Sequence, residues 1–257
     1  MNGRIWILKR CPLFERLTAA EAERLEARSS VRSFARREMI YFPSDPGCTV
    51  LLLARGRVKI KSVTPEGHES ILSLIEEGEL FGELAIIDDD ATSSRGEFAE
   101  ALEPCDVLAI PRDEIIWLMQ RRPDIALGIT KLLGFRLRRI ENRLRNILFR
   151  SNRERIIALL LELADGYGQR GDDGWDIGLR LSHQDLANLV GSTRETVTLT
   201  LGQLQREGLI TVRRQRIRLV KPSRLRAEAG EDGPLFGDAR AANRRAGSVP
   251  RPAVGPN

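Results

Sequence analysis

The segment from 181 to 204, LSHQDLANLVGSTRETVTLTLGQL, carries side chains whose chemistry matches the groups exposed in the major groove of DNA. Arg194 can donate two parallel hydrogen bonds to guanine O6 and N7, and Glu195 can accept one from the amino group of cytosine. Thr198 can reach a phosphate or a base edge, and Leu199 can contact the methyl group of thymine. The segment therefore contains the residue types that a base-reading helix needs.

Two short helices with a glycine turn between them are predicted to position these side chains. Apolar residues recur at helical spacing in both, so each helix has one inward face. The inward residues are Leu186, Leu189 and Val190, then Val197, Leu201 and Leu204. Gly191 permits the tight turn, Ser192 or Thr193 can cap the second helix, and the small Ala187 allows the helices to cross closely. Ser192 and Thr193 are also expected to contact the DNA. This pattern predicts a helix-turn-helix, with an unrelated helical hairpin as the alternative.

A basic hairpin is predicted to follow this helix pair. The run GLITVRRQRIRLV alternates around a tip formed by Arg213, Arg214 and Arg216. Between Arg194 and Arg226 the chain has nine basic and two acidic residues, a net charge of +7, whereas the whole chain carries +5. The positive charge is therefore concentrated next to the base-reading residues, and the tip suits phosphate contacts as a wing.

The N-terminal half is predicted to be an antiparallel β-roll with flanking helices. Thr18 and Glu21 form a capping box for a short helix within residues 12–29. From about Val31 to Ile110, short β-rich runs are separated by glycines, and VTPEGHES is a hairpin turn. Short strands with regular turns favour a double-sheet roll of the jelly-roll type over β-α-β units. The expected fold class is therefore α+β.

A long helix from about 124 to 149 is predicted to be the dimerisation element. Apolar residues step by four and three along it with arginines between them, as in a coiled coil. These residues are Leu133, Leu137, Ile140, Leu144 and Ile147. A helix packed on its own domain would show a similar stripe, but the charged flanks favour a seam between two chains. The simplest assembly is a two-fold homodimer.

These elements predict four segments along the chain. The roll takes residues 1–122, the dimerisation helix and a hinge take 123–152, and the winged helix-turn-helix takes 153–226. Residues 227–257, rich in Gly, Ala, Pro and Arg, are predicted to be a disordered tail. Within the third segment, the helix RERIIALLLELADGYG is expected to be closed by Gly166 and followed by a polar loop, QRGDDGWDIG.

Composition narrows the classes of function. The 257 residues are 42% hydrophobic and 30% charged, typical of soluble globular proteins, and the isoelectric point near 9.5 suits a polyanionic partner. We expect neither a membrane span nor a signal peptide. The scattered Cys11, Cys48 and Cys105 indicate a reducing compartment, the cytoplasm, and no disulfide framework. With two histidines and no nucleophile–base pair, we expect no enzymatic activity.

The order of roll, long helix and winged helix-turn-helix resembles the CRP/FNR family of bacterial transcription regulators over residues 12–222. STRETVTLTLGQLQREGLI is similar to the family's recognition helix and the start of its wing. EGELFGELAIIDDDATSSRGEFAEALEPCDVLAI is similar to the phosphate-binding cassette of its cyclic-nucleotide-type roll. The resemblance implies a homodimer that reads a near-palindromic operator in double-stranded DNA and contacts RNA polymerase, with DGYGQRGDDGW as the polymerase surface.

The resemblance also implies where an effector would bind. In members that bind cyclic AMP, a Gly–Glu pair before a short helix holds the ribose and cyclic phosphate, and an Arg followed by a small hydroxyl residue holds the phosphate. Gly82, Glu83 and the adjacent Leu84 match the first part, and Arg95 matches the second. Backbone N–H groups and a guanidinium suit an anion, and a carboxylate suits sugar hydroxyls.

The cassette departs from the cyclic-AMP pattern at several positions. Gly96 follows the arginine where the pattern has Ser or Thr, and the preceding loop is two residues longer and holds three aspartates, 88–90. Glu100 replaces a second basic residue, and Ile140 and Glu141 replace hydroxyl groups that meet the adenine. Three alternatives therefore stay open: the roll binds a cyclic nucleotide, it binds another anion, or it binds no ligand.

Other sensing chemistries of the family match the sequence less well. An iron–sulfur cluster needs several N-terminal cysteines, so none is expected with Cys11 alone. A haem would need an axial ligand in the roll, but His68 is expected on a hairpin turn and exposed to solvent. We therefore expect a DNA-binding regulator in which an effector, or one favoured roll conformation, biases a hinge near Ser151 and Asn152. The alternative is a small-molecule-binding sensor whose DNA-binding domain is secondary or silent.

Overall fold

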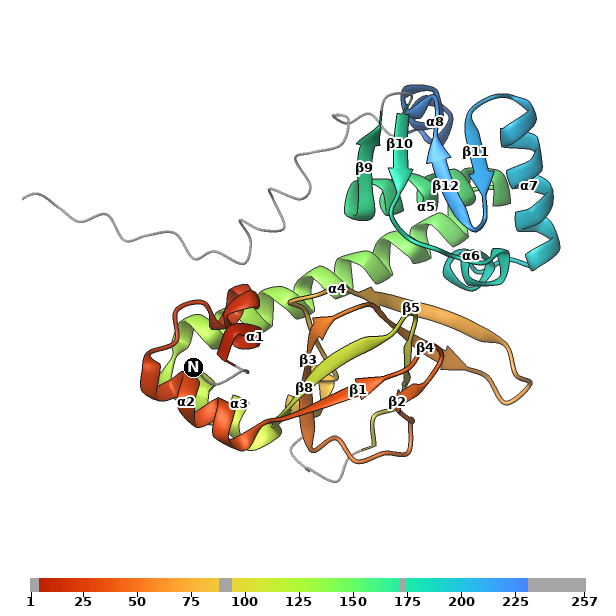
Figure 1. The fold of residues 1–257 in the computed structure, drawn as a ribbon. Helices are drawn as coiled ribbons and strands as arrows, with labels where there is room; N and C mark the ends of the chain where they lie inside the picture. Colours follow the sequence, from red (N-terminus) through yellow and green to blue (C-terminus); the bar gives the residue numbers. More distant parts are fainter. Residues whose placement is uncertain (1–4, 88–93, 172–173, 231–257) are drawn as a thin grey trace, which may run out of the picture. The chain divides into compact units, whose positions relative to one another are not determined.

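The computed structural model describes residues 5–87, 94–171 and 174–230. Two compact units divide between Gly134 and Phe135, within one long helix. The first unit contains a β-roll and N-terminal helices, and the second contains a helix-turn-helix and a small sheet (Figure 1). The predicted α+β class is confirmed. No helix within these described ranges is long and apolar enough to cross a bilayer.

Two four-stranded antiparallel sheets form the roll. One has the order β1-β8-β3-β6 and the other β2-β7-β4-β5, and an apolar core around Leu53, Val58 and Phe81 lies between them. The strands are β1 (Ser30–Phe34), β2 (Met39–Tyr41), β3 (Thr49–Arg55), β4 (Val58–Val63), β5 (Glu69–Ile75), β6 (Leu80–Phe81), β7 (Phe98–Ala101) and β8 (Cys105–Pro111). The predicted turn VTPEGHES joins β4 and β5, where Gly67 has a φ of 86°.

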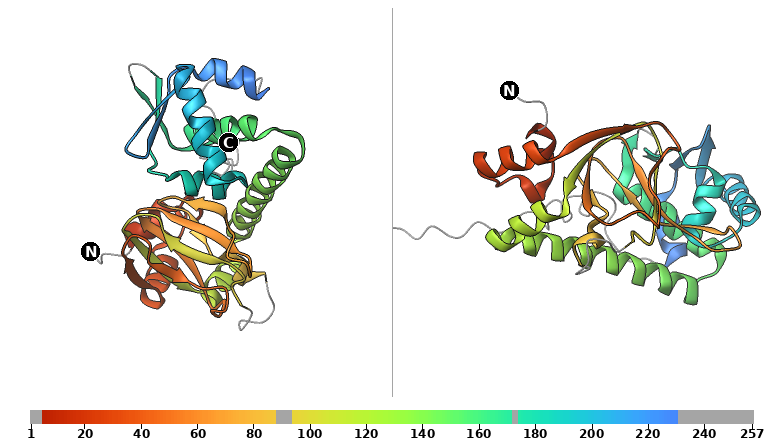
Figure 2. Two further views of the ribbon diagram at one scale, coloured as in Figure 1. Left: turned by 90° about the vertical axis from the view of Figure 1, so that its right-hand side faces the viewer. Right: turned by 90° about the horizontal axis from the view of Figure 1, so that it is seen from below.

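Helices cover the other face of the first sheet. Residues from these helices share a second apolar core with β3 and β8, which includes Leu8, Leu25, Leu52, Leu108 and Ile115. Figure 2 shows the N-terminal helices, in red, beside the strands of the roll. The helices are α1 (Ile5–Arg10), the 3-10 turn η1 (Pro12–Phe14), α2 (Ala19–Arg28) and α3 (Arg112–Arg121). The predicted capping box of Thr18 and Glu21 is confirmed at the start of α2, but α1 was not predicted.

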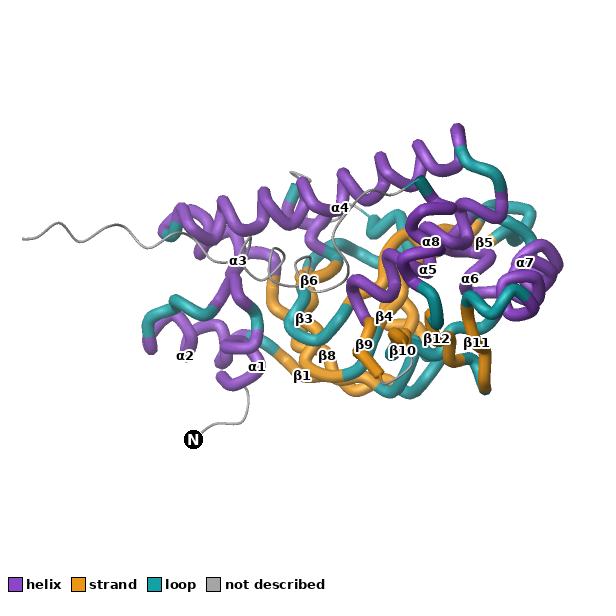
Figure 3. Tube along the Cα trace, turned by 90° about the horizontal axis from the view of Figure 1, so that it is seen from above, coloured by secondary structure: helices purple, strands orange, loops and turns teal. Residues whose placement is uncertain are grey.

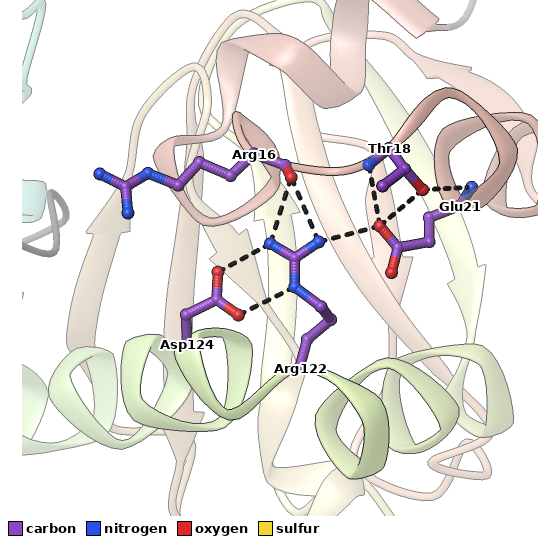
Figure 4. A network of polar contacts seen from close by, with 5 residues as sticks. All are labelled: Arg16, Thr18, Glu21, Arg122 and Asp124. Carbon is purple, nitrogen blue, oxygen red and sulfur yellow. Dashed lines mark hydrogen bonds and ion pairs between the residues drawn. The ribbon is translucent and has the colours of Figure 1, made fainter. Parts of the chain in front are cut away.

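Arg122 ties the start of the long helix α4 (Pro123–Phe149) to the N-terminal helices. Its guanidinium donates to Glu21 at 2.9 Å, to both oxygens of Asp124 at 2.9 and 3.0 Å, and to the carbonyl of Arg16 at 3.1 Å (Figure 4). The hydrogen bond from Arg122 lowers the pKa of Asp124. The backbone N–H of Thr18, then its hydroxyl, and then Arg122 lower the pKa of Glu21. The junction between α3 and α4 is therefore held by charge-assisted hydrogen bonds.

The second unit combines four helices with a four-stranded sheet of order β11-β12-β10-β9 (Figure 3). Its elements are α5 (Asn152–Tyr167), β9 (Gly168–Gly171), β10 (Gly174–Ile177), α6 (His183–Val190), α7 (Arg194–Arg206), β11 (Ile210–Arg213), β12 (Arg216–Leu219) and α8 (Pro222–Ala229). Two expectations were wrong here. Helix α5 continues past Gly166 to Tyr167, and the described residues of QRGDDGWDIG form strands on both sides of 172–173, because β9 and β10 pair and β10 also pairs with β12.

The first residues of the segment predicted as a tail, from 227 to 229, are helical. Helix α8 continues to Ala229 and ends at Gly230, whose φ is 63°. Arg153 of α5 forms an ion pair with Glu228, and Arg226 reaches Asp165 at 3.0 Å. Two ion pairs therefore fasten α8 to α5. The rest of the predicted tail lies outside the described residues.

Candidate nucleic-acid interface

Side-chain caps fix the two helices of the helix-turn-helix. Ser182 and Asp185 form a capping box at α6, and their spacing of three residues is a local signal in the sequence. Gly191 ends α6 with a φ of 70°. Of the two candidate caps for α7, the oxygen of Thr193 accepts from the backbone of Thr196 at 3.2 Å. All six predicted inward residues of α6 and α7 are buried, as the helical spacing indicated.

The outward face of α7 presents the predicted base-reading residues to solvent. Arg194 and Glu195 are exposed, and neither side chain has a hydrogen bond or ion pair within the described residues. Leu199 is 69% exposed. Glu195 and Leu199 lie on the face opposite the buried Val197, and Arg194 is the first residue of α7. All three side chains are exposed to solvent.

Thr198 differs from its neighbours because its hydroxyl is already engaged. It donates to the carbonyl of Arg194 at 2.8 Å and lies 2.8 Å from Nδ1 of His183. A hydroxyl has one hydrogen, so His183 must donate from Nδ1 in this arrangement. The hydroxyl of Thr198 is thus hydrogen-bonded within the protein, and its contact with a phosphate or a base edge stays a prediction. His183 was missed because only the crossing of α6 and α7 brings it to Thr198.

The predicted wing is the hairpin of β11 and β12. Arg213 and Arg216 are opposite each other, and the two turn residues, Arg214 and Gln215, have φ values of 46° and 65°. Such a two-residue turn normally favours glycine, and non-glycine residues in this region cost about 1–3 kcal/mol each. The backbone of Leu181 donates to Gln215 at 3.3 Å and holds the tip beside α6. The wing thus presents arginines at a strained tip.

Internal ion pairs reduce the basic surface that the sequence suggested. Arg218 binds Asp176 through two hydrogen bonds of 2.7 and 2.8 Å, which lower the pKa of that carboxyl, and Arg226 pairs with a carboxylate of α5. Arg213 and Arg214 have no such partner in the part of the chain that the structure describes. The arginines of the tip remain available to an external anion.

The predicted seam residues divide into two groups. Leu133 packs against the apolar core of the first unit. The other four share one face of α4 and are 51–57% exposed, namely Leu137, Ile140, Leu144 and Ile147. Arg139 reaches Glu162 of α5 at 2.9 Å, so this half of α4 is fastened to the second unit. A row of four exposed apolar side chains is unusual for a monomer and typical of an interface.

A hollow of about 200 Å³ lies in the roll at the predicted effector residues. Arg95 donates to the carbonyl of Gly82 at 3.2 Å and to the hydroxyl of Thr49 at 2.8 Å, and its guanidinium lies 4.5 Å from the centre of the Tyr41 ring. The lining residues are Gly47, Gly82, Leu84, Ala85, Ile87, Ser94, Arg95 and Glu97. The structure therefore brings Gly82, Leu84 and Arg95 together.

The remaining predicted effector residues are less well placed. The side chain of Glu83 is buried, and Gly96 is exposed with a φ of 72° and open space beside it. Glu100 bridges Lys59 and Lys61 at 3.0 and 2.7 Å, a buried ion cluster on the roll. Glu100 thus has a structural role and does not substitute for a ligand-binding base.

Comparison with known proteins places both units in one family. A model of the Crp-like helix-turn-helix domain matches residues 154–228, and a model of the cyclic nucleotide-binding domain matches 31–122. The chain is 32% identical to the global nitrogen regulator of Nostoc sp. over 192 residues, which cover 75% of this chain and 86% of the relative. It is 26% identical over 223 residues to a CRP-like cAMP-activated global transcriptional regulator of Mycobacterium tuberculosis, covering 87% and 98%.

Solved structures agree with the sequence relatives. The c-di-GMP-responsive global regulator CLP of Xanthomonas campestris matches with a TM-score of 0.69 and 26% identity over 79% of this chain and 99% of that chain. A CRP/FNR-family regulator of Thermus thermophilus matches with a TM-score of 0.63 and 28% identity, over 79% and 100%. This chain belongs to the CRP/FNR family of transcription regulators. As a member of that family, it is a DNA-binding transcription regulator.

The described residues of the roll of this CRP/FNR regulator differ from the cyclic-AMP pattern in the groups that they offer a ligand. Nε of Arg95 is buried without a hydrogen-bond partner among the described residues, which favours an anion. However, Gly96 supplies no hydroxyl, and the carboxylate of Glu97, which accepts from Tyr41 at 2.8 Å, lines the same hollow. The aspartates at 88–90 lie outside the described residues. The described lining therefore offers one guanidinium and one carboxylate to a ligand.

The cysteines and histidines of this CRP/FNR regulator are not gathered into a metal site within the described residues. Burial raises the pKa of Cys11 to about 12 and that of Cys105 to about 11, so both thiols stay protonated at neutral pH. His68 is exposed on the turn between β4 and β5.

Gly82→Ala should destabilise the roll more than Gly96→Ala. Both glycines have a positive φ, of 67° and 72°, so either substitution brings a backbone penalty of about 1–2 kcal/mol. At Gly82 the new methyl would also lie 2.3 Å from Nη1 of Arg95, whereas at Gly96 it would meet open space. We expect an additional loss of about 1 kcal/mol for the displaced hydrogen bond, measured by urea denaturation. In an Arg95→Ala background the two substitutions should cost the same, and a persisting difference would contradict the contact.

Proposed function

We propose that this regulator acts as a homodimer whose two α7 helices read a near-palindromic operator. The main support is the pair Arg194 and Glu195, which are exposed and uncommitted at the N-terminal end of α7. In a helix-turn-helix dimer, two such helices enter successive major grooves about 34 Å apart. The exposed face of α4 supports a dimer, because burying each leucine there contributes about 1.5–3 kcal/mol.

We further propose that an effector in the roll sets the activity by shifting the population of hinge conformations. Ser151 caps α5 in a capping box with Glu154, and this break between α4 and α5 is the predicted hinge. The side chain of Asn152 accepts from Ser192, in the turn of the helix-turn-helix, at 3.2 Å. A change at the hinge would therefore be transmitted to the base of α7. A ligand can act in this way only if it binds one conformation more tightly than the other.

The remaining parts of the proposal follow family analogy. The hairpin of β9 and β10, with the exposed Gln169 and Arg170, is the surface proposed for RNA polymerase. We propose the cytoplasm as the site of action, because the regulator must reach DNA. We also propose that the chain has no catalytic activity of its own.

A salt titration of DNA binding tests the proposed function. Arg213→Ala combined with Arg214→Gly should weaken binding to every duplex and lower the salt slope by about 2 for each bound protomer, because two phosphate contacts are lost. Glycine is chosen at 214 because φ there is 46°. The slope is measured by fluorescence anisotropy across a range of potassium concentrations.

The chain offers a matched control for this variant. Arg36 and Arg37 are adjacent, exposed arginines on the roll, and Arg37 has a φ of 68°. Arg36→Ala with Arg37→Gly should keep the slope of the unmodified protein. Equal slopes for all three proteins would remove the wing from the interface. Weak DNA binding without a steep salt dependence would instead favour the sensor with a silent DNA-binding domain.

A further inference from the structure

Leu199 is an apolar side chain in the middle of a polar, charged face. It is 69% exposed and lies one turn after Glu195 on α7, opposite the buried Val197. Its exposure has no internal explanation, since the inward positions of α7 are filled by Val197, Thr200, Leu201 and Leu204. An exposed leucine at this place is available to be buried by a partner.

Two neighbours of Leu199, Thr198 and Gly202, leave its side chain accessible to a partner. The hydroxyl of Thr198 is occupied by Arg194 and His183, so this position does not compete for a base edge as a donor. One turn later, a Cβ on Gly202 would meet no atom within 4 Å, although glycine destabilises the interior of a helix. The outward face is therefore shallow next to Leu199 and permits close approach of a groove.

The charges around Leu199 indicate which kind of partner covers it. Arg194 and Arg206 are exposed on the same helix, and the arginines of the wing add to the positive field. A purely apolar protein surface would leave these charges unpaired, whereas DNA supplies phosphates around an apolar group. The apolar group that a base presents in the major groove is the 5-methyl of thymine.

We propose that Leu199 selects thymine at one position of each operator half-site by contact with its 5-methyl group. This inference rests on the proposed role of α7 in reading DNA. An aliphatic side chain can neither donate nor accept a hydrogen bond, so it distinguishes thymine from cytosine by the methyl group alone. The predicted preference is a thymine adjacent to the base pair contacted by Glu195 or Arg194.

Uracil substitution tests this contact because it removes only the methyl group. An operator is first selected from random duplex, and each thymine is then replaced by deoxyuridine, one symmetric pair at a time. At one position, the replacement by deoxyuridine should weaken binding by about fourfold for each half-site, which is the fold-change expected for one buried methyl group. Leu199→Ala should bind the thymine and uracil operators equally. Leu72→Ala, an exposed leucine of the roll, should behave as the unmodified protein.

A second base substitution strengthens the test. Replacing the sensitive thymine by cytosine should weaken binding, and 5-methylcytosine should recover about fourfold relative to cytosine. A uracil effect that persists in Leu199→Ala, or no sensitive thymine at all, overturns the inference. The proposed function still stands after either of these results, provided that operator binding depends on Arg194. If no operator is selected, the proposed function fails and the inference fails with it.

Discussion

Leu137→Asp combined with Leu144→Asp should convert the dimer into folded monomers and weaken operator binding by about a hundredfold to ten-thousandfold. The two leucines are 57% and 55% exposed in a single protomer, so the substitutions leave its own core intact. In the dimer they would place charged groups in an apolar seam, where desolvation of a carboxylate is strongly unfavourable. The loss of affinity follows because, in a dimer, binding of one recognition helix keeps the second at a high local concentration near its half-site, and a monomer lacks this effect.

Light scattering and anisotropy measure the two consequences on the same sample, and circular dichroism checks that the helices persist. Leu127→Asp is the matched control, since this leucine of α4 is 47% exposed but lies off the repeat of the seam. The control should remain dimeric and bind the operator normally. A double variant that keeps the mass of a dimer would contradict the role of this face.

Arg194→Ala should cost about 1–3 kcal/mol on the operator, or about 5- to 150-fold for each half-site, and relax the preference at one base pair. The guanidinium has no partner among the described residues, so its removal breaks no contact there and the effect is expected on the DNA. Binding to random duplex should change little, because a contact to a base edge adds nothing on the wrong sequence.

Arg206→Ala provides the comparison for this variant, because Arg206 is exposed at the other end of the same helix. It should leave the base preference unchanged. Operator variants at each position are compared by competition. Equal losses on every sequence for Arg194→Ala would identify Arg194 as a phosphate contact and remove it from base reading.

The helix-turn-helix could be predicted because its signals are local. Gly191, Thr193 and the spacing of Val197, Leu201 and Leu204 each act within a few residues, and the structure agrees with all of them. The capping box at α2 and the turns of the roll were readable for the same reason.

The features that were missed depend on contacts between distant parts of the chain. The segment GQRG has no strand pattern of its own, and it forms β9 beside β10, which in turn pairs with β12. Asp176 of β10 binds Arg218 of β12, which lies 42 residues later in the sequence. Helix α8 is held by Arg153, which is 75 positions away from Glu228. Local sequence patterns do not indicate contacts between residues so far apart in the chain.

The effector residues show the same limit at the site itself. Gly82 and Arg95 could be singled out from motif and spacing, and they do meet in the hollow. That the guanidinium is held by Thr49, 46 positions away, and lies over the ring of Tyr41 could not be inferred from either residue. The ligand preference of the roll therefore depends on neighbours that the motif does not include.

Selection from a random pool of duplex DNA by the unmodified protein tests the central claim most directly. The account predicts an enriched sequence with two-fold symmetry, whose half-sites are centred about one helical turn, or 34 Å, apart and are bound by one dimer. An enriched sequence without symmetry, or no enrichment above the starting pool, would contradict it.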